Sequence, residues 1–247
     1  MADATSNSVK SQLPFELVYQ VGALIVAIIL VHLVYITVIR PNADAILAAQ
    51  AERVAQGEEY IQDRSLYVVL KDFEQETCFI LMIWAMAIMG YKARAALRER
   101  ALLSEDIISV SDGMSILPED TREYTRGVQA LPLETQNYLL PRALMSALQR
   151  FASTRNVQDV SEAIKTVCES ESDRLDSELA MVRYIAWAIP SIGIIGTVRG
   201  IGEALGQAYK AVEGDIAGVT ASLGVAFNST FTALVISIVL MFLMHQL

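Results

Sequence analysis

The sequence is poor in the residues that catalytic and metal sites usually need. It has only two cysteines, Cys78 and Cys168, and two histidines, His32 and His245, in 247 residues. No phosphate-binding loop, zinc-ligand spacing or internal repeat is visible, and no serine stands in a Gly-x-Ser-x-Gly hydrolase motif. We therefore expect a protein that is not an enzyme and holds no cofactor or metal. The isolated cysteines fit free, buried thiols.

Charged residues are also scarce, and acidic residues outnumber basic ones. They make up 19% of the chain, and the formal net charge is -9. Nucleic-acid binding depends on clustered Lys and Arg that neutralise phosphates, so nucleic acid is excluded as a partner. Hydrophobic residues reach 53% and the mean hydropathy is +0.40, whereas ordinary soluble domains are less apolar. The composition therefore predicts a membrane protein.

Four segments approach the length needed to cross the bilayer as helices, which is roughly 20 mostly apolar residues. They are 17–39, 78–91, 184–208 and 219–244. The first is too long for a signal peptide, and we expect Arg40 and Pro41 to end it. The second is short, but Phe73 and the stem of Lys92 can extend it. The fold class predicted is all-α, polytopic, with long helices that extend into a cytoplasmic helical region.

These segments divide the chain into six regions. They are an N-terminal tail (1–16), a first membrane helix (17–39), an amphipathic linker (40–77), a second membrane helix (78–91), a cytoplasmic helical region (92–182) and a hairpin of two membrane helices (183–247). Within the cytoplasmic region, 106–123 is predicted to be a loop.

Basic residues after the second segment set the expected orientation. Lys92, Arg94, Arg98 and Arg100 crowd against its end, and short basic flanks stay in the cytoplasm. Both termini are then cytoplasmic and 209–218 is external. If the second segment does not span, the linker moves inside and the N-terminus moves outside.

The third membrane helix contains a proline, a row of glycines and one threonine. Pro190 removes a backbone hydrogen bond and favours a bend. The glycines allow close approach of another helix: Gly193, Gly196, Gly200, Gly202 and Gly206. The hydroxyl of Thr197 either bonds to the carbonyl four residues earlier or lines a pathway.

The fourth membrane helix has a stripe of small, mildly polar residues: Ser222, Ala226, Thr230, Ala233 and Ser237. Polar groups are costly in hydrocarbon, so Asn228, Ser229, Thr230 and Thr232 are expected to face protein or a wet cavity. If Thr197 and Thr230 face the same space, their hydroxyls can relay a proton or coordinate a small cation.

The predicted hairpin lacks a suitable titratable group. A proton-coupled machine needs an ionisable group near mid-membrane. Glu203 lies toward the outer end of the third helix, His32 is in the first, and Arg199 is cationic and would repel protons or extend to the interface. An acidic residue must therefore come from a partner chain.

The residues IPSIGIIGTVRGI and LGVAFNSTFTALVISIVL resemble the two core helices of the MotA/TolQ/ExbB proton channel family. The resemblance covers 181–247 well. It implies a homopentameric ring of this subunit around two copies of a single-span MotB/TolR/ExbD-like partner whose Asp carries the proton. It further implies that Thr197 and Thr230 match the family's pore threonines, and that Pro190 marks the bend where the third helix enters the pore. Arg199 departs from the family, whose TolQ-like members usually have an aromatic residue there.

The expected function is that of a proton-driven stator or motor subunit, multi-pass in the bacterial inner membrane. The candidate ion pathway comprises Thr197, Asn228, Ser229 and Thr230. Sodium remains open as the coupling ion, and the process driven, whether import, envelope maintenance, motility or defence, also remains open. The alternatives are a non-conducting membrane scaffold and, less favoured, an intramembrane hydrolase.

Overall fold

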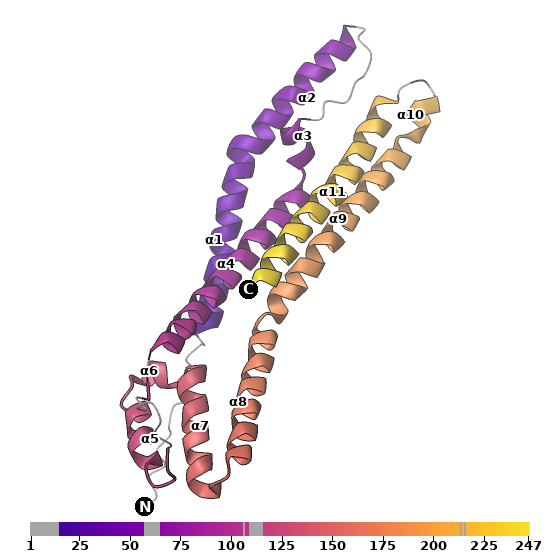
Figure 1. The fold of residues 1–247 in the computed structure, drawn as a ribbon. Coiled ribbons are helices and arrows are strands. Elements are labelled where there is room, and N and C mark those ends of the chain that lie inside the picture. The colour runs from indigo at the N-terminus through magenta and orange to yellow at the C-terminus, as the bar shows by residue number, and fades with distance from the viewer. Residues whose placement is uncertain (1–14, 57–64, 106, 109–115, 213, 215) are drawn as a thin grey trace, which may run out of the picture. The chain divides into compact units, whose positions relative to one another are not determined.

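A computed structural model describes residues 15–56, 65–105, 107–108, 116–212, 214 and 216–247 (Figure 1). Every secondary-structure element in these ranges is helical, which confirms the predicted all-α class. Most of the predicted N-terminal tail, part of the linker and part of the predicted loop at 106–123 lie outside the described residues.

The chain divides into two compact units. We call residues 1–89 and 182–247 the membrane-helix unit, and residues 90–181 the intervening unit. Within the described ranges, four helical runs are long and apolar enough to cross a membrane: Glu16–Arg53, Phe73–Ser104, Val157–Gly206 and Ala217–Gln246. This supports the predicted multi-pass membrane protein. The predicted 78–91 segment lies within helix α4, which runs over Phe73–Ala101.

The prediction that Arg40 and Pro41 end the first helix is wrong. Helix α1 (Phe15–Val34) leads through a π-helical turn, η1 (Tyr35–Ile39), directly into α2 (Arg40–Ala55). Proline has no N–H and its ring clashes with the carbonyl four residues earlier. The π-helical turn is wider than an α-helical turn and accommodates Pro41 without ending the helix. The Asn42 side chain donates a hydrogen bond to the Val38 carbonyl at 2.7 Å.

Helices α9 (Ala180–Gly206) and α11 (Ala217–Gln246) lie side by side, with the short α10 (Ala208–Val212) between them in sequence (Figure 1). The predicted close approach is confirmed at three glycines. A Cβ on Gly193 would lie 2.6 Å from the Ala233 Cβ, and one on Gly200 would lie 2.7 Å from the Ala226 nitrogen. A Cβ on Gly196 would lie 2.5 Å from the Ser229 Cβ.

The other two glycines of α9 do not take part in this contact. A Cβ on Gly202 or Gly206 would meet no atom of the described structure within 4 Å. The predicted stripe of small residues on α11 is therefore matched by only the first three glycines of α9. Side chains on the opposite side of α11, such as Phe227, Phe231 and Ile238, are exposed.

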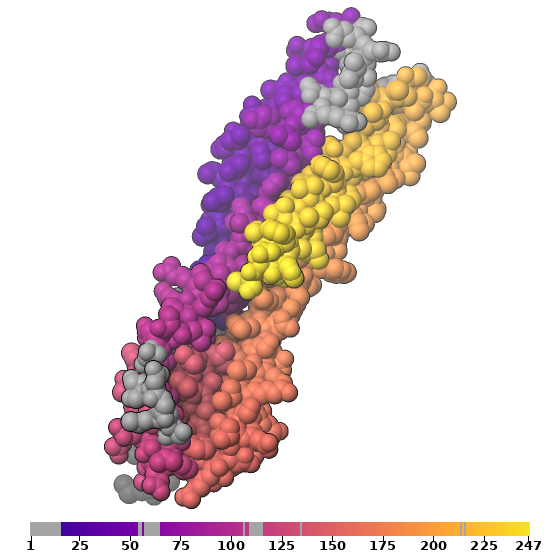
Figure 2. Space-filling model, viewed as in Figure 1, coloured from indigo at the N-terminus to yellow at the C-terminus, as the bar shows by residue number. Residues whose placement is uncertain are grey.

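The core of the membrane-helix unit is formed by α4, α9 and α11, and Figure 2 shows α11 packed along α9. Its buried residues are Cys78, Ala85, Ile88, Met89, Val182, Ile185, Ala186, Ile189, Ala233, Ile236 and Leu240. The short α3 (Leu66–Leu70) packs against α11. Cys78 is a buried free thiol as expected, but the same expectation is wrong for Cys168, which is exposed on α8.

The intervening unit holds η2 (Leu102–Ser104), α5 (Thr121–Gln129), α6 (Leu133–Gln136), α7 (Leu139–Thr154) and α8 (Val157–Glu178). Helices α7 and α8 form a hairpin whose tight connection places Arg155 in the left-handed region, with φ of 53°. The Asn156 side chain then accepts a hydrogen bond from the Gln158 backbone N–H at 3.0 Å and caps α8.

Candidate ion-pathway site

The two threonines predicted to line a pathway meet between α9 and α11. The hydroxyls of Thr197 and Thr230 form a hydrogen bond. The Thr197 hydroxyl also lies 3.0 Å from the Ala226 carbonyl and 3.2 Å from the Gly193 carbonyl. The Thr230 hydroxyl lies 3.0 Å from the same Gly193 carbonyl. Both side chains are partly buried, so the pair has limited access to its surroundings.

The hydrogens of this pair can be arranged in two ways. Each hydroxyl has one hydrogen and can also accept. Thr230 can donate to Thr197 while Thr197 donates to the Ala226 carbonyl, or Thr197 can donate to Thr230 while Thr230 donates to the Gly193 carbonyl. Rotation of the two hydroxyls interconverts these arrangements. The pair can therefore present either a donor or an acceptor without changing charge.

Glycines explain why the hydroxyls can touch. Gly193 lies one helical turn before Thr197, and Gly196 directly precedes it. Both glycines pack closely against α11. Side chains at these positions would force the helices apart. The threonine pair therefore depends on the same small residues that pack the hairpin.

The two other predicted pathway residues lie next to Thr230 in sequence. Ser229 is buried, with 1% of its surface exposed, and its hydroxyl accepts a hydrogen bond from the Gln75 amide of α4 at 3.3 Å. Asn228 is partly buried. The Ser229 contact is thus directed toward α4.

The first turn of α4 contains a polar cluster that the sequence prediction missed. Glu74 and Gln75 are each 1% exposed, and Glu76 is 7% exposed. These residues were assigned to the linker because the apolar run starts at Cys78. One signal could have found them: an arginine in an apolar helix, here Arg199, needs an acidic partner.

Glu74 supplies that partner. Its carboxylate accepts two hydrogen bonds from the Arg199 guanidinium, from Nε at 2.7 Å and from Nη2 at 3.0 Å. Arg199 also donates to Glu203 at 3.0 Å, lies 3.8 Å from Asp72, and stacks on the Phe73 ring at 4.9 Å from its centroid. Acidic groups therefore surround the Arg199 guanidinium and offset its charge. They hold the side chain in place.

Asp72, just before α4, completes this group of charges. Burial raises the pKa of its carboxyl above the ordinary value, and the positive charges of Lys71 and Arg199 only partly offset this. Its Oδ2 atom accepts no hydrogen bond from the described residues. Burial thus favours the neutral form of this carboxyl relative to an exposed aspartate.

Glu76 makes a second ion pair, directed away from the hairpin. Its carboxylate lies 2.5 Å from His32 Nδ1 of α1 and 2.6 Å from Arg40 Nη2 of α2. One buried carboxylate of α4 thus contacts both α1 and α2. No cluster of His, Cys, Asp or Glu in the described ranges could hold a metal ion.

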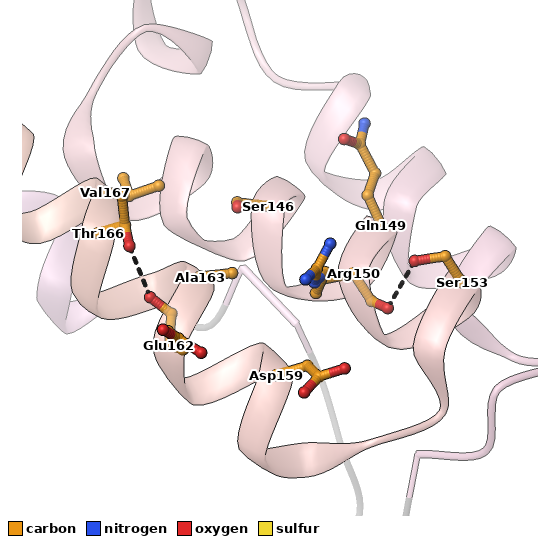
Figure 3. Close-up of a pocket in the computed structure, with 9 residues that line it drawn as sticks. All are labelled: Ser146, Gln149, Arg150, Ser153, Asp159, Glu162, Ala163, Thr166 and Val167. Atoms are coloured by element: carbon orange, nitrogen blue, oxygen red, sulfur yellow. Dashed lines mark hydrogen bonds between the residues drawn. The ribbon is translucent and has the colours of Figure 1, made fainter.

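The intervening unit has a separate open groove of about 600 Å³ between α7 and α8 (Figure 3). It is lined by Ser146, Gln149, Arg150, Ser153, Asp159, Glu162, Ala163, Thr166 and Val167. Two of its hydroxyls bond within their own helices, Ser153 to the Arg150 carbonyl and Thr166 to the Glu162 carbonyl, each at 2.9 Å. None of the predicted pathway residues lines this groove.

The fold and the hydroxyl pair define a multi-pass helical membrane protein with a small-residue hairpin. Residues 135–247 match the model of the MotA/TolQ/ExbB proton channel family, which confirms the predicted resemblance over this part of the chain. The match begins in α6 and includes both α9 and α11. The chain matches no curated protein and no solved structure.

Proposed function

We propose that this chain is the pore subunit of a proton-driven motor in the bacterial inner membrane. The observation that carries the proposal is the Thr197–Thr230 hydroxyl pair, which lies between the two helices that match the proton channel family. A hydroxyl pair that can reverse its donor direction is suited to pass or stabilise a proton carried by a neighbouring group.

The group that carries the charge must come from outside this pair, because threonine does not titrate. Two buried carboxylates near the hairpin are already engaged, because Glu74 pairs with Arg199 and Glu76 pairs with Arg40. Asp72 precedes α4 and lies 3.8 Å from Arg199, outside the threonine pair. We propose an aspartate on a single-span MotB/TolR/ExbD-like partner, with two partner helices inside a ring of five copies of this chain. The transmembrane potential provides about 2.3 kcal/mol per charge per 100 mV for such a cycle.

Ion flux through the complex tests the proposal. The chain is co-expressed with its single-span partner and reconstituted into liposomes that contain a pH-sensitive dye. Thr230→Val removes the hydroxyl at nearly constant volume and should lower proton flux at least about tenfold, the effect of one lost hydrogen bond at the barrier. Thr230→Ser retains the hydroxyl and should retain flux.

A matched control lies on the same helix. The Thr220 hydroxyl bonds only locally among the contacts seen, to the Ile216 carbonyl at 3.0 Å. Thr220→Val should leave proton flux unchanged. Full flux in Thr230→Val, or equal losses in both variants, would contradict the proposal. Flux that follows a sodium gradient instead would assign sodium as the coupling ion.

Assembly is tested separately by native mass spectrometry of the co-expressed complex. Five copies of this chain with two of the partner are expected for the wild type and for Thr230→Val. An assembled complex that conducts neither ion would favour the non-conducting scaffold.

A further inference from the structure

The first turn of α4 presents three consecutive buried polar side chains to three different parts of the membrane-helix unit. Glu74 binds Arg199 of α9, Gln75 binds Ser229 of α11, and Glu76 binds His32 and Arg40 of the first helical run. Successive residues of an α-helix point about 100° apart, so three of them cover more than half of its circumference. This turn of α4 is therefore enclosed by polar contacts on several sides.

Two of the three contacts adjoin the threonine pair. Gln75 binds Ser229, which directly precedes Thr230. Glu74 packs toward Gly196, which directly precedes Thr197: a Cβ on Gly196 would lie 3.2 Å from the Glu74 Cγ. Neighbouring residues on α4 thus contact both pore helices within one residue of their threonines.

The contact between Glu74 and Arg199 also fixes the orientation of α9 relative to α4. The carboxylate and guanidinium share two hydrogen bonds, at 2.7 and 3.0 Å, and a bidentate pair defines an angle as well as a distance. The Glu74 side chain is 1% exposed, so water competes little for these bonds. A pair of this kind resists both sliding and rotation of α9 against α4.

We propose that Glu74 and Gln75 are positioning residues that set the separation of the Thr197 and Thr230 hydroxyls. Helix α4 lies outside the two-helix signature and acts on the ion pathway only through its neighbours. This inference rests on the proposed function, because it takes the threonine pair to be part of the ion pathway. The separation of the Thr197 and Thr230 side chains can be measured whether or not the complex conducts ions.

Disulfide formation measures that separation directly. Thr197→Cys and Thr230→Cys are introduced together in a chain in which Cys78 and Cys168 are replaced by Ser. Because the two native hydroxyls touch, the introduced sulfur atoms should lie within disulfide reach. Copper phenanthroline is added to the complex in membranes, and the rate of cross-linking is followed by the mobility of the chain on gels.

Glu74→Gln removes the charge that holds Arg199 and should slow cross-linking at least about tenfold, as expected when reacting groups are misplaced. Glu76→Gln is the matched control: it makes the same change two residues away, at another buried carboxylate, but one bound to His32 and Arg40. Its cross-linking rate should equal that of the parent. The exchanged pair Glu74→Arg with Arg199→Glu should recover part of the lost rate.

A native cross-linking rate in Glu74→Gln overturns the proposal, and so does equal slowing in Glu76→Gln, which would indicate general loosening. If Glu74→Gln does not assemble, Gln75→Leu makes the same test without unpairing a charge. It should slow cross-linking, and a native rate there overturns the proposal. Slowed cross-linking in Glu74→Gln, together with no ion flux through the wild-type complex, would retain the positioning role and reject only the proposed function.

Discussion

The Ser237 hydroxyl donates a hydrogen bond at 3.0 Å to the Ala186 carbonyl, which lies four residues before Pro190. In a regular helix this carbonyl would accept from the backbone N–H of residue 190, but proline has none. A free carbonyl is costly inside a membrane, and a serine of a neighbouring helix can satisfy it. Helix α9 thus continues through Pro190 while α11 supplies the missing donor.

This relationship predicts a coupling between the two positions. Ser237→Ala should lower the free energy of unfolding by about 1–2 kcal/mol, because it leaves the Ala186 carbonyl without a donor. In a Pro190→Ala background the new backbone N–H can bind that carbonyl, so the same serine substitution should cost less than about 0.5 kcal/mol. Reversible unfolding of the detergent-solubilised chain in SDS gives the four free energies of the cycle. Equal costs in both backgrounds would show that the serine does not replace the proline's missing donor.

The glycines of α9 provide a second prediction. In Gly200→Ala, the added Cβ would lie 2.7 Å from both the Ala226 nitrogen and the Ser222 carbonyl oxygen, and backbone atoms cannot rotate away. The hairpin should lose about 1–3 kcal/mol of stability through overpacking. Gly202→Ala makes the same change two residues away, where the Cβ would meet no described atom within 4 Å. SDS unfolding should show no loss for this control, and similar losses in the two variants would mean that close helix contact does not explain Gly200.

The sequence predicted the hairpin well because its signals are local. Glycine spacing on α9 and small-residue spacing on α11 each identify one face of a helix, and the structure joins these faces at Gly193, Gly196 and Gly200. The sequence left open whether Thr197 and Thr230 face the same space, and in the structure their hydroxyls meet beside this contact. Gly202 and Gly206 share the local signal, yet a Cβ on either would meet no described atom within 4 Å. Spacing alone does not specify which glycines face a partner surface.

The polar cluster on α4 could not be predicted in the same way. Glu74 and Arg199 are 125 residues apart in sequence, and nothing local to either residue identifies the other as its partner. Hydropathy placed the start of the second membrane helix at Cys78, whereas α4 begins at Phe73. A charged residue can be buried when a residue on a distant helix neutralises its charge. Average hydropathy is calculated from neighbouring residues in sequence, so it does not detect such a pair.

The two thiols should differ in reactivity. Cys78 is 1% exposed within the core of the membrane-helix unit, whereas Cys168 is exposed on α8. A water-soluble maleimide should label one thiol per folded chain and two after unfolding in SDS, as counted by mass spectrometry. Cys168→Ser should abolish labelling of the folded chain, and Cys78→Ser should leave it unchanged. Rapid labelling of Cys78 in the folded chain would contradict its place in the core.

One buried carboxylate joins α7 and α8. The Glu171 side chain is 4% exposed, lies 2.8 Å from Arg142 of α7 and also pairs with Arg174 one turn later on α8. Glu171→Gln would remove the charge that both guanidiniums bind and should cost about 1–3 kcal/mol, because hydrogen bonds to charged groups are the stronger ones. The arginines are partly exposed, and water can solvate them once they are released, so the loss should stay within this range.

Glu169→Gln is the matched control on the same helix. The Glu169 side chain is 64% exposed, and its contact with Lys165 is 3.6 Å long, so its removal should change stability by less than about 0.5 kcal/mol. Hydrogen exchange of the α7 and α8 amides in the full chain reports on this hairpin directly. Faster exchange in Glu171→Gln but not in Glu169→Gln is the expected result. Equal exchange in the two variants would mean that apolar packing, rather than the buried carboxylate, holds α7 against α8.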